Sequence, residues 1–140
     1  MKLFSALLAL ALLVAVPASA ATVGQFTENR SLVTATIVIA DSTTISPAIN
    51  LGGTRLVGIY IPAEFDGTAL TFTASATIDG TYVAVDVDHT SASAYTVTST
   101  ASRYVPLINP DVMRGLKFIK IVTSSAQTTT NTVFTLVTLP

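Results

Sequence analysis

The sequence contains few residues of the kinds that usually carry chemistry. Of its 140 residues none is cysteine or tryptophan, one is histidine and only 11% are charged, with a net charge of −1. The absence of cysteine excludes disulfides, thiolate metal ligands and a cysteine nucleophile. Its seven basic residues are scattered along the chain, which argues against a broad nucleic-acid-binding face. The length fits one domain.

Two acidic groups are candidate sites. Asp86, Asp88 and His89 crowd the end of one predicted strand, where two carboxylates on one face could bind a hard cation such as Ca²⁺. The dense Asp/Asn/Gly spacing of a calcium loop is absent, which favours solvated acids instead. The second group could supply a glycosidase acid pair, but tryptophan platforms for sugar rings are missing. Its members are Glu64, Asp66 and Asp79.

No recognised catalytic motif supports an enzyme. The sequence has no glycine-rich phosphate loop, no G-x-S-x-G nucleophile elbow and no H-E-x-x-H zinc motif. We therefore predict no catalytic, cofactor-binding or metal-binding residues, no cofactor, no nucleic-acid or small-molecule partner, and no enzymatic activity.

The first 20 residues have the pattern of a secretory signal. Lys2 precedes the apolar run Leu3–Val16, and Ala18-Ser19-Ala20 forms an A-x-A ending, which predicts cleavage after Ala20. The run is shorter than the roughly 20 residues of a membrane span. The alternative is an uncleaved hydrophobic arm. Either reading divides the chain into residues 1–20, a linker over 21–30 and one domain over 31–140.

The pattern of residues 31–140 predicts short strands joined by turns, because Val, Ile, Thr, Phe and Tyr dominate and no stretch has apolar residues at helical spacing. About eight or nine strands with regular turn signals predict an antiparallel β-sandwich or jelly roll. Asp66-Gly67 and Asp79-Gly80 are expected to supply positive-φ turn positions, and Val112–Arg114 a short helical turn. The predicted strands are Leu32–Ala40, Thr43–Leu51, Arg55–Ile61, Ala69–Thr77, Tyr82–Asp88, Ala94–Ser99, Arg103–Ile108, Leu116–Thr123 and Thr132–Leu139.

Residue alternation predicts which faces are buried. Leu70, Phe72 and Ala74 share one face of their strand, opposite a face of Thr and Ser. The strand Arg55–Ile61 is instead apolar on both faces, which indicates a covered strand or a subunit contact. Outer faces made of hydroxyl groups carry little charge, and the free-energy cost of desolvating them against another protein is small. We therefore expect a homo-oligomer, or docking on a larger surface.

The stretch from Ser31 to Pro140 resembles a family of small virion-associated β-sandwich proteins of tailed bacteriophages. The resemblance implies a jelly-roll-like fold and a structural role, such as capsid decoration or cementing, with no catalytic site. The signal-like N-terminus departs from that family. The segments that carry the resemblance are Ile49–Gly52, Arg55–Ile59, Ile61–Ala63, Leu70–Ser75, Asp79-Gly80, Ser102–Val105, Gly115–Lys120 and Phe134–Val137.

Two functional hypotheses follow. The first is a non-enzymatic virion protein, located in the virion, that forms oligomers on a capsid or other virion protein. The second is an exported module, periplasmic or extracellular after cleavage following Ala20, that binds glycans or mediates adhesion. Glycan sites usually expose aromatic clusters, and at least two of the four tyrosines lie in core-like patterns. These are Tyr60, Tyr82, Tyr95 and Tyr104.

Overall fold

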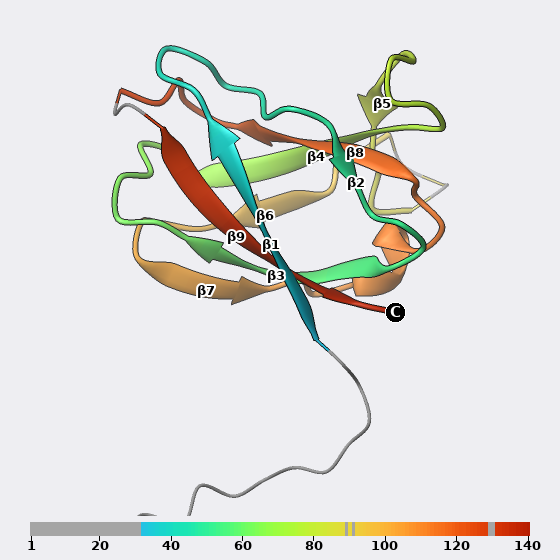
Figure 1. The fold of residues 1–140 in the computed structure, drawn as a ribbon. Coiled ribbons are helices and arrows are strands. Elements are labelled where there is room, and N and C mark those ends of the chain that lie inside the picture. Colours follow the sequence, from blue (N-terminus) through green and yellow to red (C-terminus); the bar gives the residue numbers. More distant parts are fainter. Residues whose placement is uncertain (1–31, 89, 91, 129–130) are drawn as a thin grey trace, which may run out of the picture.

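The protein folds as a sandwich of two antiparallel sheets. The computed structural model describes residues 32–88, 90, 92–128 and 131–140. Over these residues nine strands and one 3₁₀ turn form two stacked layers (Figure 1). The predicted all-β sandwich is confirmed. The predicted segments 1–20 and 21–30 and the candidate His89 lie outside the described residues.

Each sheet has a central pair of long strands. Sheet A has the order β1 (Val33–Ile39), β9 (Thr132–Leu139), β3 (Arg55–Ile61) and β7 (Arg103–Pro106). Sheet B has the order β2 (Ile49–Asn50), β8 (Phe118–Thr123) and β4 (Ala69–Ser75), with β5 (Val83–Ala84) and β6 (Thr96–Thr98) both paired to the far edge of β4. The 3₁₀ turn η1 (Pro110–Met113) follows β7.

The connectivity is that of a jelly roll. Strands pair as nested partners along the chain: β1 with β9, β2 with β8, β3 with β7, and β4 with β5 and β6. This nesting folds one long hairpin over itself and places alternate strands in opposite sheets. Most pairings therefore join residues far apart in the sequence.

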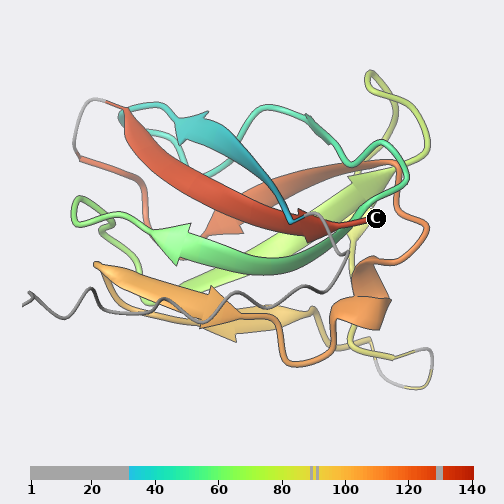
Figure 2. The same ribbon diagram turned by 60° about the horizontal axis from the view of Figure 1, so that its bottom comes forward.

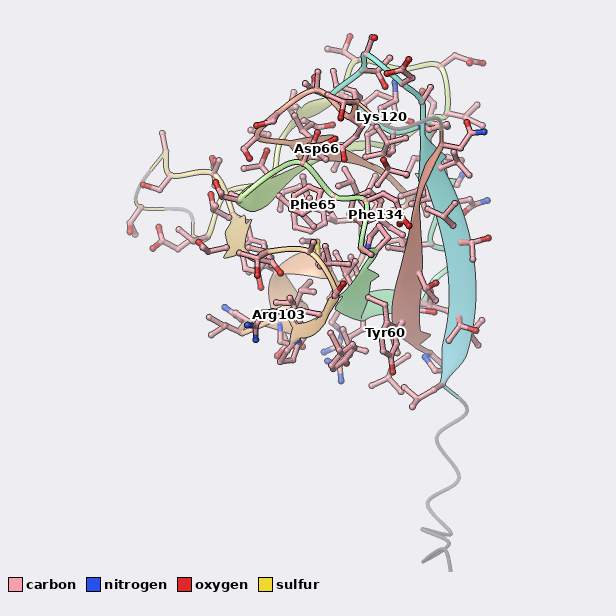
Figure 3. All side chains as sticks on the ribbon, turned by 90° about the vertical axis from the view of Figure 1, so that its left-hand side faces the viewer. Tyr60, Phe65, Asp66, Arg103, Lys120 and Phe134 are labelled. Atoms are coloured by element: carbon pink, nitrogen blue, oxygen red, sulfur yellow. The ribbon has the colours of Figure 1, made fainter. Side chains whose placement is uncertain are left out.

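The core fills the space between the two layers. Leu70 and Phe72 point inward from β4, as the alternation predicts, and meet inward side chains of β9 such as Phe134 and Leu136. Phe65, from the loop before β4, packs edge-on against Phe134 with ring centroids 5.6 Å apart (Figure 3). Each large apolar side chain buried here contributes about 1.5–3 kcal/mol.

A β-bulge explains why β3 is apolar on both faces. The pairing of β3 with β9 shifts between Leu56 and Gly58, so Val57 is the extra residue. The shift breaks the alternation, and Leu56 joins Ile59 in the core, both fully buried. The apolar pattern of β3 is thus largely a consequence of the bulge and is weaker support for a subunit contact than the sequence implied.

Two predicted strands are much shorter than expected. The prediction Thr43–Leu51 is wrong over most of its length: β2 has two residues, and Ile45 forms an isolated bridge to Val122. Pro47 lacks an N–H, and the Ser46 hydroxyl accepts the Ile121 N–H at 2.9 Å, so a side chain replaces part of the ladder. The prediction Tyr82–Asp88 reduces to β5 and a bridge from Asp86 to Ala94.

The Asp-Gly turns were wrongly interpreted. The glycines with positive φ are Gly52, Gly53 and Gly115 among the described residues, so Gly67 and Gly80 do not supply that geometry. Gly67 is required by space instead, because a Cβ there would collide with the Phe65 ring and lie 2.9 Å from the Ser124 hydroxyl.

Candidate interaction surface

The outward face of sheet A is uncharged except at the start of β3, where Arg55 lies opposite Leu139 and forms an ion pair with Asp111. We call the uncharged part of this surface the sheet A face. Strand register places its residues in rows; for example, Thr36, Thr135 and Tyr60 lie side by side across β1, β9 and β3. The residues of the sheet A face carry no charge, so a protein that docks on them and leaves the Arg55–Asp111 pair in water desolvates no ion. The face comprises Thr34, Thr36, Val38, Val133, Thr135, Val137, Gly58, Tyr60, Tyr104 and Pro106.

Two exposed tyrosines form the most prominent feature of the sheet A face. Tyr60 on β3 and Tyr104 on β7 are directly opposite in register, with ring centroids 4.7 Å apart and a 44° angle between planes. They are 51% and 46% exposed. Gly58 provides the space for this arrangement, because a Cβ at that position would overlap the Tyr104 hydroxyl and ring. Exposed tyrosines of this kind are common anchors at binding surfaces.

A second apolar pair lies on the β1 and β9 side of the sheet A face, one outward position along these strands from the row that contains Tyr60. Val38 on β1 is opposite Val133 on β9, and the two side chains are 39% and 42% exposed. Thr36 and Thr135 lie beside both pairs, so the surface combines apolar patches with hydroxyl groups. This agrees with the sequence-based expectation of a low-charge outer face.

The outward face of sheet B is different, because the protein covers part of it with its own chain. The ammonium group of Lys120 on β8 lies 4.2 Å from the Tyr82 ring centroid, and the Tyr82 hydroxyl donates to the Ile78 carbonyl at 3.0 Å. The loop between β4 and β5 therefore folds over this sheet and holds a positive charge there. Sheet B is a poorer candidate for apolar docking.

The margin between β6 and β7 contains a groove of about 330 Å³. Figure 2 shows these two strands side by side, one from each sheet. Tyr95, Val97 and Val105 form its apolar lining. Ile108 at its rim is 98% exposed, whereas Tyr95 is 5% exposed. The groove is shallow and apolar, and no charged side chain is among its lining residues.

The acidic residues considered from sequence do not assemble as a described site. The Asp88 carboxylate accepts hydrogen bonds from the Thr90 N–H and hydroxyl at 2.7 and 2.8 Å, a local turn, and Asp86 is exposed. No group of three or more metal-binding side chains is found within the ranges that the structure covers. His89, the third member of that cluster, is not among the described residues.

The three acidic residues considered for a glycosidase pair do not gather at one place: Glu64 and Asp66 lie in the loop before β4, and Asp79 lies in the loop after it. Asp66 precedes β4 and Asp79 follows it, and the seven-residue strand between the two loops is roughly 23 Å long. Glycosidase carboxyl groups lie about 5–10 Å apart. Asp66 has a structural contact instead: its carboxylate accepts the Thr128 N–H at 2.7 Å and the Thr128 hydroxyl at 2.9 Å, and these hydrogen bonds lower its pKa.

Sequence reasoning missed the tyrosine pair. The alternation pattern indicated outward positions within single strands, but the contact between Tyr60 and Tyr104 depends on the pairing of β3 with β7. That pairing is non-local and was not predictable from either strand alone. Of the other two tyrosines, Tyr95 is buried and Tyr82 is half-buried.

Comparisons with known proteins give a fold relationship. No protein-family model matches the chain, and no curated protein matches it. Among solved structures it is similar to the crystal structure of SPBc2 prophage-derived protein YomS, with a TM-score of 0.50 and 15% sequence identity. The match covers 82% of this chain and 99% of that one. At this identity the likeness shows a shared fold.

The described part of the chain also contains no helix of the length and apolar character needed to cross a membrane.

Proposed function

We propose that this protein is a non-enzymatic structural component of a bacteriophage particle that decorates or cements a capsid or other virion surface. The uncharged sheet A face, with its exposed tyrosine pair, is the observation that carries the proposal. A rigid jelly roll can bridge neighbouring subunits and add buried area at their seams, which resists internal pressure. The prophage origin of the structural neighbour supports a phage context.

The docking step is assigned to sheet A for an energetic reason. Interface cores are poor in charge and rich in tyrosine, because a desolvated ion without a partner costs several kcal/mol while an aromatic ring contributes buried area. The sheet A face meets both conditions. Sheet B carries the charged Lys120, and its Tyr82 ring already packs against that ammonium group, so sheet B is less suited to apolar docking.

The experiment compares two matched variants on particles. Thr135→Arg places a charge at the centre of the sheet A face, and Thr73→Arg places the same charge on the central strand β4 of sheet B; both threonines are half-buried. Each purified protein is added to virions that lack it, and the bound fraction is measured by co-sedimentation. We expect at least tenfold weaker binding for Thr135→Arg and near wild-type binding for Thr73→Arg.

Failure of the wild-type protein to bind virions, together with its absence from purified virions by mass spectrometry, contradicts the proposal. Equal loss for both variants contradicts the assignment to sheet A. A melting curve of each variant establishes that it is folded before binding is compared.

A second candidate function is an exported glycan-binding or adhesion module. The observation that favours it is the Tyr60–Tyr104 pair, since exposed aromatic rings stack on sugar faces. The signal-like segment ending at Ala20 agrees with export. Intact-mass measurement separates the candidates: a secreted species beginning at Ala21 favours export, and full-length protein in virions favours the first proposal. A glycan array then tests sugar binding, with Tyr60→Ala as the matched variant.

A further inference from the structure

Within the described residues no strand pairs with the outer edge of β1, and this edge lacks the features that normally protect an edge strand. Its seven residues, Val33–Ile39, contain no charge and no proline, and they pair with β9 in one unbroken register. Edge strands usually carry lysine, proline or a bulge, because their unpaired N–H and C=O groups otherwise pair with another chain. Figure 3 shows β1 along the outer margin of sheet A.

The other described edges are protected or short. At the opposite edge of sheet A, β7 ends in Pro106 and begins with Arg103. In sheet B the edge strands β2, β5 and β6 have two, two and three residues. Among the described strands, β1 is therefore the long edge that is open to pairing.

The side chains of β1 are also unusually exposed. Its first four residues are exposed on both faces, and Val33 is 48% exposed although its side chain points toward the core side. Leu32, directly before the strand, is 62% exposed. A strand laid against this edge would cover apolar surface as well as backbone groups.

We propose that β1 pairs antiparallel with the β1 strand of a second copy, which joins the two A sheets into one continuous sheet. Pairing centred on Thr36 uses the whole strand and keeps outward residues on one face. Thr34 then lies opposite the second copy's Val38, and Val33 opposite its Ile39. The strand has no charge, so like charges do not meet across the axis. The two sheet A faces become adjacent, and the docking surface doubles.

The area of the β1–β1 contact is too small for a stable dimer in solution, so the pairing is expected where a particle holds copies close together. A seven-residue strand is roughly 23 Å long and a sheet roughly 10 Å thick, so the edge contact buries about 460 Å² in total. Stable dimers usually bury more than about 1,000 Å². The pairing is therefore weak in dilute solution and is strengthened where copies are held close together. In this respect the inference rests on the proposed function.

Cysteine cross-linking tests the pairing, because the sequence has no cysteine of its own. In the proposed register Thr36→Cys faces its own copy at about 4.5–5.5 Å between Cα atoms, within disulfide range. Thr34→Cys and Val38→Cys face each other, so each alone gives little dimer and an equal mixture gives a disulfide-linked pair. Thr135→Cys, on the neighbouring strand in register with Thr36, is the control. Oxidation is performed at one high protein concentration and read on non-reducing gels.

We expect at least fivefold more dimer for Thr36→Cys, and for the Thr34→Cys and Val38→Cys mixture, than for Thr135→Cys. Equal yields for Thr36→Cys and Thr135→Cys overturn the edge pairing in favour of face-to-face contact. Cross-linking of Thr36→Cys with Tyr104→Cys, but not with itself, overturns it in favour of head-to-tail pairing through β7. Virion co-sedimentation of the wild-type protein, whose sheet A face is intact, separates the two proposals: binding by the wild-type protein, with no specific cross-link from Thr36→Cys, refutes the pairing and leaves the virion role standing.

Discussion

Replacing Gln127 by methionine tests how the end of the sandwich is held together. The Gln127 side chain is fully buried and connects two loops. Its carbonyl oxygen accepts the Asp66 N–H at 3.2 Å, and its amide donates to the Ser125 carbonyl at 2.9 Å. Methionine has similar volume and removes both hydrogen bonds, so the loss is polar rather than steric.

The expected cost follows from which groups lose their partner. The Ser125 carbonyl keeps the Thr123 hydroxyl at 2.7 Å, so it stays satisfied. The partly buried Asp66 N–H loses the Gln127 acceptor, which costs about 1–2 kcal/mol, the lower part of the range for an unsatisfied buried group. For a domain of this size that corresponds to a fall in Tm of about 5–15 °C.

The assay is thermal and urea unfolding followed by circular dichroism. Ala126→Met introduces the same side chain at the adjacent exposed position and is expected to change stability by less than about 0.5 kcal/mol. A Gln127→Met protein as stable as Ala126→Met would refute the reasoning that the buried amide ties these loops.

Three further predictions concern charge and space. Hydrogen bonds from Thr128 lower the pKa of Asp66, so the stability that its carboxylate contributes is present above the ordinary aspartate pKa and is lost as pH falls through the lowered value. Asp66→Asn should therefore flatten the profile of Tm against pH below about pH 4. A variant whose Tm falls with pH in this range as steeply as the wild type contradicts this. Asp111→Asn removes the ion pair to Arg55. The Asp111 side chain is 67% exposed and that of Arg55 is 29% exposed, so the free energy of unfolding in urea should fall by less than about 1 kcal/mol; a larger fall contradicts the solvent-screened pair. Gly58→Ala should displace the Tyr104 ring and remove the aromatic contact worth about 0.5–1.5 kcal/mol, with a changed near-UV tyrosine signal; an unaltered spectrum argues against the close approach.

The sequence was sufficient for the strands whose pattern and boundaries agree. β3 and β9 have the predicted bounds, because β-branched and aromatic residues fill them; Gly53 precedes β3 and Pro62 follows it. The inward face of β4 followed from its alternation alone. These are local properties, because the alternation of apolar and polar residues along one strand is enough to predict them.

What the sequence could not predict depends on contacts between distant residues. The bulge at Val57 resets the faces of β3, and it is defined only by pairing with β9. Ser46 replaces part of a ladder by a side-chain hydrogen bond to Ile121, which required knowing that β8 passes nearby. The candidate site shows the same limit: a low-charge outer face was expected from composition, whereas the Tyr60–Tyr104 pair follows from the register of β3 and β7.

Hydroxyl-radical footprinting of the protein free and bound to virions tests the central claim most directly. Tyr60 and Tyr104 lie on the sheet A face, while Tyr82 covers Lys120 on sheet B and serves as an internal reference. The account predicts that oxidation of Tyr60 and Tyr104 falls severalfold on the particle while oxidation of Tyr82 is unchanged. Protection of Tyr82 with Tyr60 and Tyr104 oxidised as in the free protein would contradict it.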